Sequence, residues 1–298
     1  MENQPPNNGN EQMAQLPELT DPTLCAMDVA IEEQQDTTRR GYLGASEIGD
    51  PCARKLWYGF RMATPRYFDA ATLKRFEDGH RGEALMAERL AMVPGVTIST
   101  STPDGSQWGM QAHEGHFRGH CDGFIKGLLQ APVTPHVWEH KVVNETKQKK
   151  LATLKREKGE KEALAHWDPV YYAQAQVYMH KFELTRHYLT CSSPGERTTV
   201  SVRTNYNPEH AANFMQRAKD IIVSDQPPVR LSNDPTNYVC KWCDYHAVCH
   251  DIKPMAVNCR TCAHSFPDRE GAWGCNRHGV LSREKQLAAC PDYAGIAA

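Results

Sequence analysis

The strongest constraint on the fold is a short apolar segment that carries two charged side chains near its centre. Residues 137–143 read Val-Trp-Glu-His-Lys-Val-Val, and the surrounding segment 135–143 is predicted to form a β-strand. Alternate side chains of a strand point to opposite faces, so Glu139 and Lys141 project together while His140 projects the other way. A fold built around this strand therefore places a carboxylate beside an ammonium group on one face of a sheet.

Hydrophobic periodicity on both sides of this strand predicts an α/β fold. Helices are expected over 68–92, from Asp168 at an N-cap position to about Phe182, and over 208–224. Ser46 is expected to cap a further short helix that runs through residues 54–58. The expected strands are 96–102 with an extension over 107–112, 117–125, 135–143, 186–191 and 198–204. This order of helix, three strands, helix and strand gathers polar residues at one sheet edge and its flanking helix.

A second carboxylate, Asp122, lies in the expected strand that precedes the central one. If the two strands are neighbours, Asp122 lies beside Glu139 and Lys141. Hard divalent cations take carboxylate oxygen ligands, and such a cation can lower the pKa of an attacking water. A nearby lysine can stabilise the charge that develops during hydrolysis. The alternative interpretation is an ordinary surface ion pair between Glu139 and Lys141.

Two flanking helices offer further polar residues at helical spacing. His80 and Glu83 are three positions apart on the first expected helix and share one of its faces. Gln174 and Tyr178 are four positions apart on the second and also share a face. Both pairs are expected to flank the same cleft.

In this order, Gly-His-x-x-Glu, Gly-x-x-Asp, Glu-x-Lys and Gln-x-x-x-Tyr resemble the RecB-like branch of the PD-(D/E)XK nucleases. The resemblance implies a restriction-endonuclease-like core and metal-dependent cleavage of DNA. It assigns Mg²⁺ or Mn²⁺ binding to His80, Asp122, Glu139 and the carbonyl of His140, catalysis to Lys141, and support of the site and of DNA to Gln174 and Tyr178. Cys121 stands where the family's name has proline.

One cysteine before the expected core and three after it form a first candidate metal set: Cys52, Cys240, Cys243 and Cys249. This arrangement is similar to that of the iron–sulfur nucleases, which include AddB-type subunits and CRISPR-associated RecB-like exonucleases. The resemblance implies a 4Fe–4S cluster on these four residues. Two alternatives stay open, namely zinc on the same thiolates, or a zinc site completed by His246 or His250 in place of Cys52.

A second cysteine set lies near the end of the chain. The Cys-x2-Cys spacing at Cys259 and Cys262 is a strong metal signal, and Cys275 and Cys290 supply two further thiolates. We expect a zinc site with four cysteine ligands, with His264 or His278 as alternatives to one of them. Few apolar residues lie in this tail, so metal is expected to support its fold.

Eight basic residues and three acidic residues lie between Lys141 and Lys161, an excess that predicts contacts with DNA phosphates. A solvated helix face is the alternative interpretation. The expected DNA-binding residues are Lys147, Lys149, Lys150 and Lys155.

The chain of 298 residues is expected to contain three parts: a disordered segment over 1–40, a nuclease domain over 41–252 closed by the iron–sulfur cluster, and a zinc module over 253–298. Its net charge of −2 means that any polyanion site must be local. No segment predicts a membrane span or a secretory signal, so a cytoplasmic location is expected.

The resulting hypothesis is a DNA exonuclease of recombination, repair or phage DNA processing. The alternative is an inactive DNA-binding module or adaptor, and a protein partner could dock on the C-terminal module.

Overall fold

A mixed five-stranded sheet forms the centre of the computed structural model, which describes residues 21–37, 39–195 and 197–297. Its strand order is β2-β5-β6-β7-β8, with β6 and β7 parallel and the other neighbours antiparallel. The strands are β2 (Thr97–Ser99), β5 (Gly123–Lys126), β6 (His136–Val142), β7 (Arg186–Ser192) and β8 (Thr199–Asn205). The predicted α/β fold is therefore confirmed, and the central strand is β6.

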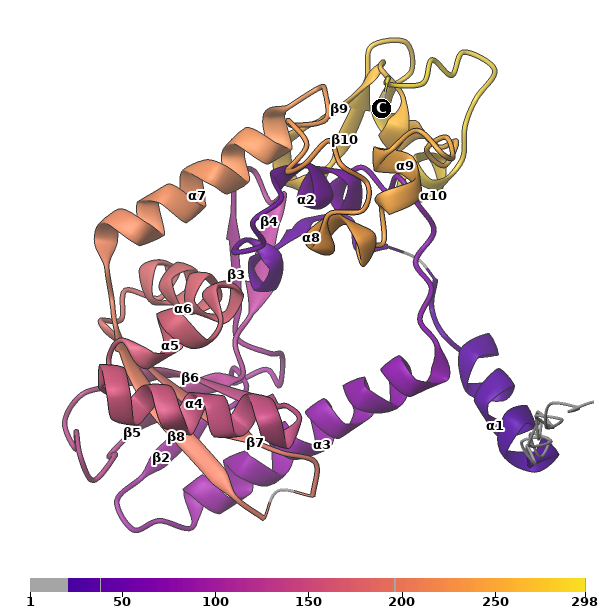
Figure 1. The fold of residues 1–298 in the computed structure, drawn as a ribbon. Helices are drawn as coiled ribbons and strands as arrows, with labels where there is room; N and C mark the ends of the chain where they lie inside the picture. Colours follow the sequence, from indigo (N-terminus) through magenta and orange to yellow (C-terminus); the bar gives the residue numbers. More distant parts are fainter. Residues whose placement is uncertain (1–20, 38, 196, 298) are drawn as a thin grey trace, which may run out of the picture.

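Helices pack on both faces of this sheet, as Figure 1 shows. The helix α3 (Ala70–Ala91) packs its Met86 against Trp138 of β6 and Tyr188 of β7. The main hydrophobic core contains Val137 and Leu189 from the opposite face, together with residues of α4 (Glu145–Lys158) and α6 (Pro169–Lys181). The helices α5 (Ala163–Trp167) and α7 (Pro208–Val223) pack beside α6. Strand β6 is thus buried on both faces for most of its length.

The strand expected over 117–125 is interrupted at Cys121 and Asp122. Its first part, β4 (Phe117–His120), joins a separate sheet of order β1-β4-β3, with β1 at Leu43–Gly44 and β3 at Gly109–Ala112. Its second part is β5 of the central sheet. Periodicity did not predict this break, because both parts have apolar residues at alternate positions. The interruption has a functional consequence, since it frees Asp122 from strand pairing.

Two local predictions near the start of the chain need correction. Ser46 lies inside the 3-10 turn η1 (Ala45–Glu47) and does not begin a helix. The short helix α2 (Ala53–Phe60) begins after Cys52, whose side chain makes no cap hydrogen bond. Pro51 fixes the backbone just before that start, which favours a later helix origin than Ser46. The segment expected to be disordered contains the helix α1 (Pro22–Glu33), while residues 1–20 lie outside the described residues.

Helix α1 is held by polar contacts at its surface. Asp21 accepts hydrogen bonds from the first turn, Asp28 forms an ion pair with Lys74 of α3, and Glu32 accepts from the amide of Ala70. None of its residues is fully buried. A helix without a buried stripe leaves a weak periodic signal, so the sequence pattern did not reveal it.

The C-terminal tail packs directly on α2, at the opposite end of the molecule from the central sheet (Figure 1). Trp273 is fully buried against Phe60, with ring centroids 5.3 Å apart. The guanidinium of Arg260 lies 3.7 Å from the centre of the Trp273 ring, and Arg61 donates to the carbonyls of Arg260 and Ser265. The tail therefore shares a hydrophobic core with the rest of the chain.

The tail's elements are short. They are α8 (Tyr238–Lys241), α9 (His246–Cys249), η2 (Cys259–Thr261), β9 (Ser265–Pro267), η3 (Arg269–Gly271), β10 (Trp273–Cys275), β11 (Gly279–Leu281) and α10 (Arg283–Leu287). Strands β9, β10 and β11 form an antiparallel sheet. Within the described residues, no helix has the length and apolar character needed to cross a membrane.

Candidate active site

Asp122, Glu139 and Lys141 meet at the point where the β4–β5 loop approaches β6. The backbone N–H of His140 donates to Asp122 Oδ2 at 2.7 Å, and the N–H of Asp122 donates to Glu139 Oε1 at 3.3 Å. Lys141 Nζ lies 2.5 Å from Glu139 Oε2 and 3.6 Å from Asp122 Oδ2. The structure therefore brings the three predicted side chains into mutual contact.

The site holds its charges in a largely buried environment. Glu139 is 2% exposed, and burial together with the charge of Asp122 raises the pKa of its carboxyl to about 8. Burial alone would lower the pKa of Lys141, but Asp122 and Glu139 outweigh it and raise that pKa above its ordinary value. The lysine is therefore charged, and a further cation would stabilise the two carboxylates in their ionised forms.

Glu83 of α3 contributes a third carboxylate to the same centre. Burial and the charge of nearby Asp122 raise the pKa of Glu83 to about 7, although the positive charge of Lys141 opposes them. Sequence analysis placed Glu83 on the cleft side of this helix but gave the metal to His80, which is exposed one turn earlier. The spacing of three positions could not distinguish them, because both residues share a helix face.

The His140 side chain points away from this centre, as strand alternation predicts. Its Nδ1 lies 2.9 Å from Thr190 Oγ1 and its Nε2 lies 3.0 Å from Ser192 Oγ, both on the neighbouring strand β7. Trp138 Nε1 donates to the same Thr190 hydroxyl at 3.0 Å. Burial lowers the pKa of His140 to about 4, so the ring is neutral. This polar network fixes the back of β6 and hence the backbone that binds Asp122.

Gln174 and Tyr178 act on the Asp122 loop from α6. The Tyr178 hydroxyl donates to the carbonyl of His120 at 2.7 Å, and Gln174 Nε2 donates to that hydroxyl at 3.3 Å. A Cβ atom added at Gly119 would lie 2.8 Å from the Tyr178 hydroxyl and 2.7 Å from Ala45 Cβ. Glycine at this position therefore allows the tyrosine to reach the loop, which explains the Gly-x-x-Asp spacing physically.

The four predicted DNA-binding lysines separate into different environments. Lys147 Nζ forms an ion pair with Asp168 at 2.7 Å and lies 4.9 Å from the centre of the Tyr171 ring. Lys141 Nζ lies 5.6 Å from the centre of the same ring. Lys155 is half-buried and donates to a backbone carbonyl of β8, whereas Lys149 and Lys150 are exposed on α4. Lys147 is thus the member of this set that reaches the surroundings of Lys141.

An open cavity of about 700 Å³ extends from Asp168 and Tyr171. Most of its basic and aromatic lining has no local sequence signal, because these residues are dispersed over the linker before β1, the segment before α3, α2 and the turn before α9. The lining includes Arg39, Arg40, Lys55, Arg66, Tyr42, Tyr67, Phe68 and Tyr245. Acidic Glu47 and Asp50 also line it, but they pair with Arg40 and Lys55.

The first cysteine set is brought together around one smaller cavity of about 90 Å³. It is lined by Cys52 just before α2, Cys240 of α8, Cys243 in the segment between α8 and α9, and Cys249 of α9. Four cysteines separated by up to 197 positions therefore face a common space, which suits a bound metal group. Within the described part of the chain, no three of these sulfur atoms lie within 4.8 Å of one another.

The second cysteine set is also gathered, at the surface of the tail. Burial raises the pKa of the Cys259 thiol, and negative charge on Cys290, Cys262 and Cys275 raises it further. This mutual influence places the four thiols near each other. Cys25, by contrast, is an exposed thiol of α1, and Cys121 and Cys191 are buried singly in the core.

The sequence matches no model of a protein family and no protein with curated annotation. The solved structures that resemble it include an alkaline exonuclease from Laribacter hongkongensis, at 14% identity and a TM-score of 0.43, over 61% of this chain and 87% of that chain. The same enzyme in complex with dAMP matches at 14% identity and a TM-score of 0.43, over 63% and 90% of the two chains. A phage-related exonuclease from Haemophilus somnus 129PT matches at 11% identity and a TM-score of 0.39, over 57% and 77%. At this level of similarity, the function must be argued from the site itself.

Replacing Gly119 by alanine tests the link between Tyr178 and the Asp122 loop. The added methyl group overlaps Ala45 and Tyr178, so we expect a loss of about 1–3 kcal/mol in the free energy of unfolding, measured by urea denaturation. Gly79→Ala is the matched control, because nothing lies within 4 Å of its added Cβ in α3. It should be neutral or stabilise by about 0.5–1 kcal/mol. Equal stability of the two variants would contradict the packing argument.

Proposed function

We propose that this protein is a divalent-metal-dependent deoxyribonuclease with a restriction-endonuclease-like core of the PD-(D/E)XK type. The observation that carries the proposal is the convergence of Asp122, Glu139 and Lys141 at one buried position, with Glu83 beside them. Ion pairs formed only for stability rarely bury an excess of carboxylates, because like charges repel in a medium of low dielectric constant. A site for Mg²⁺ or Mn²⁺ explains this excess.

The carboxylates of Asp122 and Glu139 would hold the cation, with Glu83, His80 and the carbonyl of His140 as further oxygen or nitrogen donors. A bound cation would lower the pKa of an attacking water and offset charge on a phosphodiester. Lys141 is held charged by Glu139 and Asp122, so it can stabilise the additional negative charge that develops on the phosphate during hydrolysis. Gln174 and Tyr178 support this arrangement by fixing the carbonyl of His120, two residues before Asp122.

DNA is the proposed substrate because the large cavity beside the site combines guanidinium groups with aromatic rings. Arg66 lies 4.7 Å from the centre of the Phe68 ring, and Tyr67 is 62% exposed. Arginine binds phosphate, and exposed aromatic rings stack on bases. The cavity adjoins Tyr171, whose ring contacts Lys141, so a strand bound there would lead to the catalytic centre. Exonuclease action in recombination, repair or phage DNA processing is the most specific form of this proposal.

The proposed cofactor of the first cysteine set is a 4Fe–4S cluster on Cys52, Cys240, Cys243 and Cys249. The cavity that these four cysteines line together supports a bound metal group at this place. A cluster here would join the start of α2 to α8 and α9 and so close a long loop of the chain. For the tail we propose structural zinc on Cys259, Cys262, Cys275 and Cys290, which would leave that surface available to DNA or to a protein partner.

Substitution of the three central residues tests the nuclease proposal. Full-length protein is incubated with end-labelled single-stranded and duplex DNA in Mg²⁺, Mn²⁺ or EDTA. We expect metal-dependent cleavage that falls by about 10²–10³-fold or more in Asp122→Asn, Glu139→Gln and Lys141→Met, because each loses a charge that the reaction needs. Glu145→Gln, an exposed acid at the start of α4, is the matched control and should cleave normally. Wild-type rates in all three variants would reject the proposed site.

Metal analysis tests the cluster. Protein purified without oxygen should contain about four iron atoms and four acid-labile sulfides per chain, and Cys52→Ser should lose most of both. Cys25→Ser removes an exposed thiol of α1 and should leave the iron content unchanged. Zinc in place of iron in the wild-type protein would contradict the proposal.

A further inference from the structure

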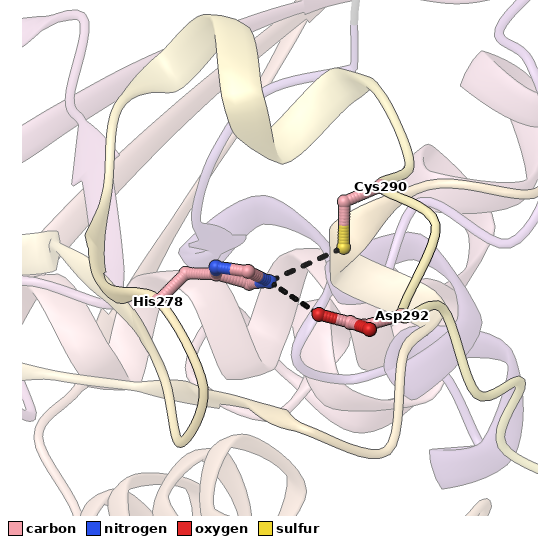
Figure 2. Close-up of side chains that lie close together, drawn as sticks. All are labelled: His278, Cys290 and Asp292. Carbon is pink, nitrogen blue, oxygen red and sulfur yellow. Dashed lines mark hydrogen bonds and ion pairs between the residues drawn. The ribbon is translucent and has the colours of Figure 1, made fainter.

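Three side chains with different donor atoms converge at the surface of the tail, apart from the catalytic centre. His278 lies in the turn between β10 and β11, and Cys290 and Asp292 lie in the segment after α10. Figure 2 shows both of these side chains directed at the His278 ring. His278 Nε2 is 3.1 Å from Asp292 Oδ2 and 3.6 Å from Cys290 Sγ. The three donor atoms all lie within 4.8 Å of one another.

Hydrogen bonding does not satisfy this arrangement fully. A neutral imidazole nitrogen carries at most one proton, yet Nε2 faces a carboxylate and a sulfur at the same time. A proton on Nε2 can point well at only one of these two neighbours. A cation between the three donor atoms would be attracted to all of them, with a neutral imidazole as the third donor.

The distances also match those between ligands of a tetrahedral zinc ion. Zinc bonds of about 2.3 Å to sulfur and about 2.0–2.2 Å to nitrogen or oxygen place nitrogen and sulfur about 3.6 Å apart and nitrogen and oxygen about 3.4 Å apart. The observed separations are 3.6 Å and 3.1 Å. Imidazole, thiolate and carboxylate are the three side-chain donors that zinc accepts.

We propose that His278, Cys290 and Asp292 bind a divalent transition-metal ion such as Zn²⁺. The side chains of His278 and Asp292 are 44% and 47% exposed, so the fourth position is open to water or to an external ligand. A site with three protein ligands and one open position exchanges its metal more readily than a closed site does. Bound metal would tie the β10–β11 turn to the end of the chain.

This site and the proposed four-cysteine zinc site compete for the Cys290 thiolate, so the tail can form only one of them at a time. The His278 site has nitrogen and oxygen as its other donor atoms, so one thiolate contacts the metal instead of four. The proposal is independent of the nuclease function, because neither His278 nor Asp292 belongs to the catalytic centre. The number of bound thiolates and the effect of His278 distinguish the two tail sites.

Cobalt(II) titration of the full-length protein provides the test, since its thiolate charge-transfer absorption reports bound sulfur and its visible bands report tetrahedral geometry. Difference spectra between wild-type and variant proteins remove the contribution of other metal sites. We expect His278→Ala and Asp292→Asn each to weaken one cobalt site by at least about tenfold, with a difference spectrum of one thiolate per metal. Competition with Zn²⁺ should displace this cobalt.

His264→Ala is the matched control, because His264 is a neighbouring tail histidine that accepts a hydrogen bond from Arg277. It should leave cobalt binding unchanged, and circular dichroism should show that all variants are folded. The proposal is overturned if the wild-type protein gives no such site, if cobalt binding is the same in His278→Ala and Asp292→Asn, or if His264→Ala weakens binding equally.

Discussion

The backbone hydrogen bond from His140 to Asp122 Oδ2 is the contact on which the candidate active site depends. It joins a loop, which strand pairing leaves free, to the buried central strand β6 of the sheet. Each of its two ends has a separate support: Tyr178 holds the loop through the carbonyl of His120, and Thr190 and Ser192 hold the His140 ring behind the strand. Carboxylates that repel one another need such rigid supports, because without them the loop would move apart and expose the charges to water.

Helix α2 connects the remaining features of the molecule. Cys52 at its start lines the first cysteine cavity, while Phe60 at its end packs on Trp273 of the tail. The adjoining Arg61 donates to the carbonyl of Arg260, which lies between the first two cysteines of the tail. A metal group at either cysteine set would therefore stabilise the same eight-residue helix from one end. The tail belongs to this shared core, and the proposed ligands His278 and Asp292 are exposed at its surface.

The sequence pattern predicted those elements whose structure depends on residues close to one another in the chain. The periodicity of β6, the Asp168-Pro169 start of α6 and the cysteine spacings all depend on near neighbours in the chain. The pattern failed where contacts between residues far apart in the chain determine the structure. The break between β4 and β5 is an example, because the Tyr178 hydroxyl and the separate β3–β4 pairing stabilise it. Glu83 was underestimated for the same reason, because only the approach of α3 to Asp122 distinguishes it from His80. The cavity lining around Arg66 has no local signal at all.

The central claim is that Asp122, Glu139 and Glu83 form a site for a divalent cation next to Lys141. Anomalous diffraction from crystals soaked in Mn²⁺ measures this directly, without any assumption about substrate. The account predicts a manganese peak in contact with Asp122 and Glu139, on the side of Glu83, which is lost in crystals of the Glu139→Gln variant. Manganese density elsewhere in the molecule, with none at these carboxylates at saturating Mn²⁺, would contradict the account.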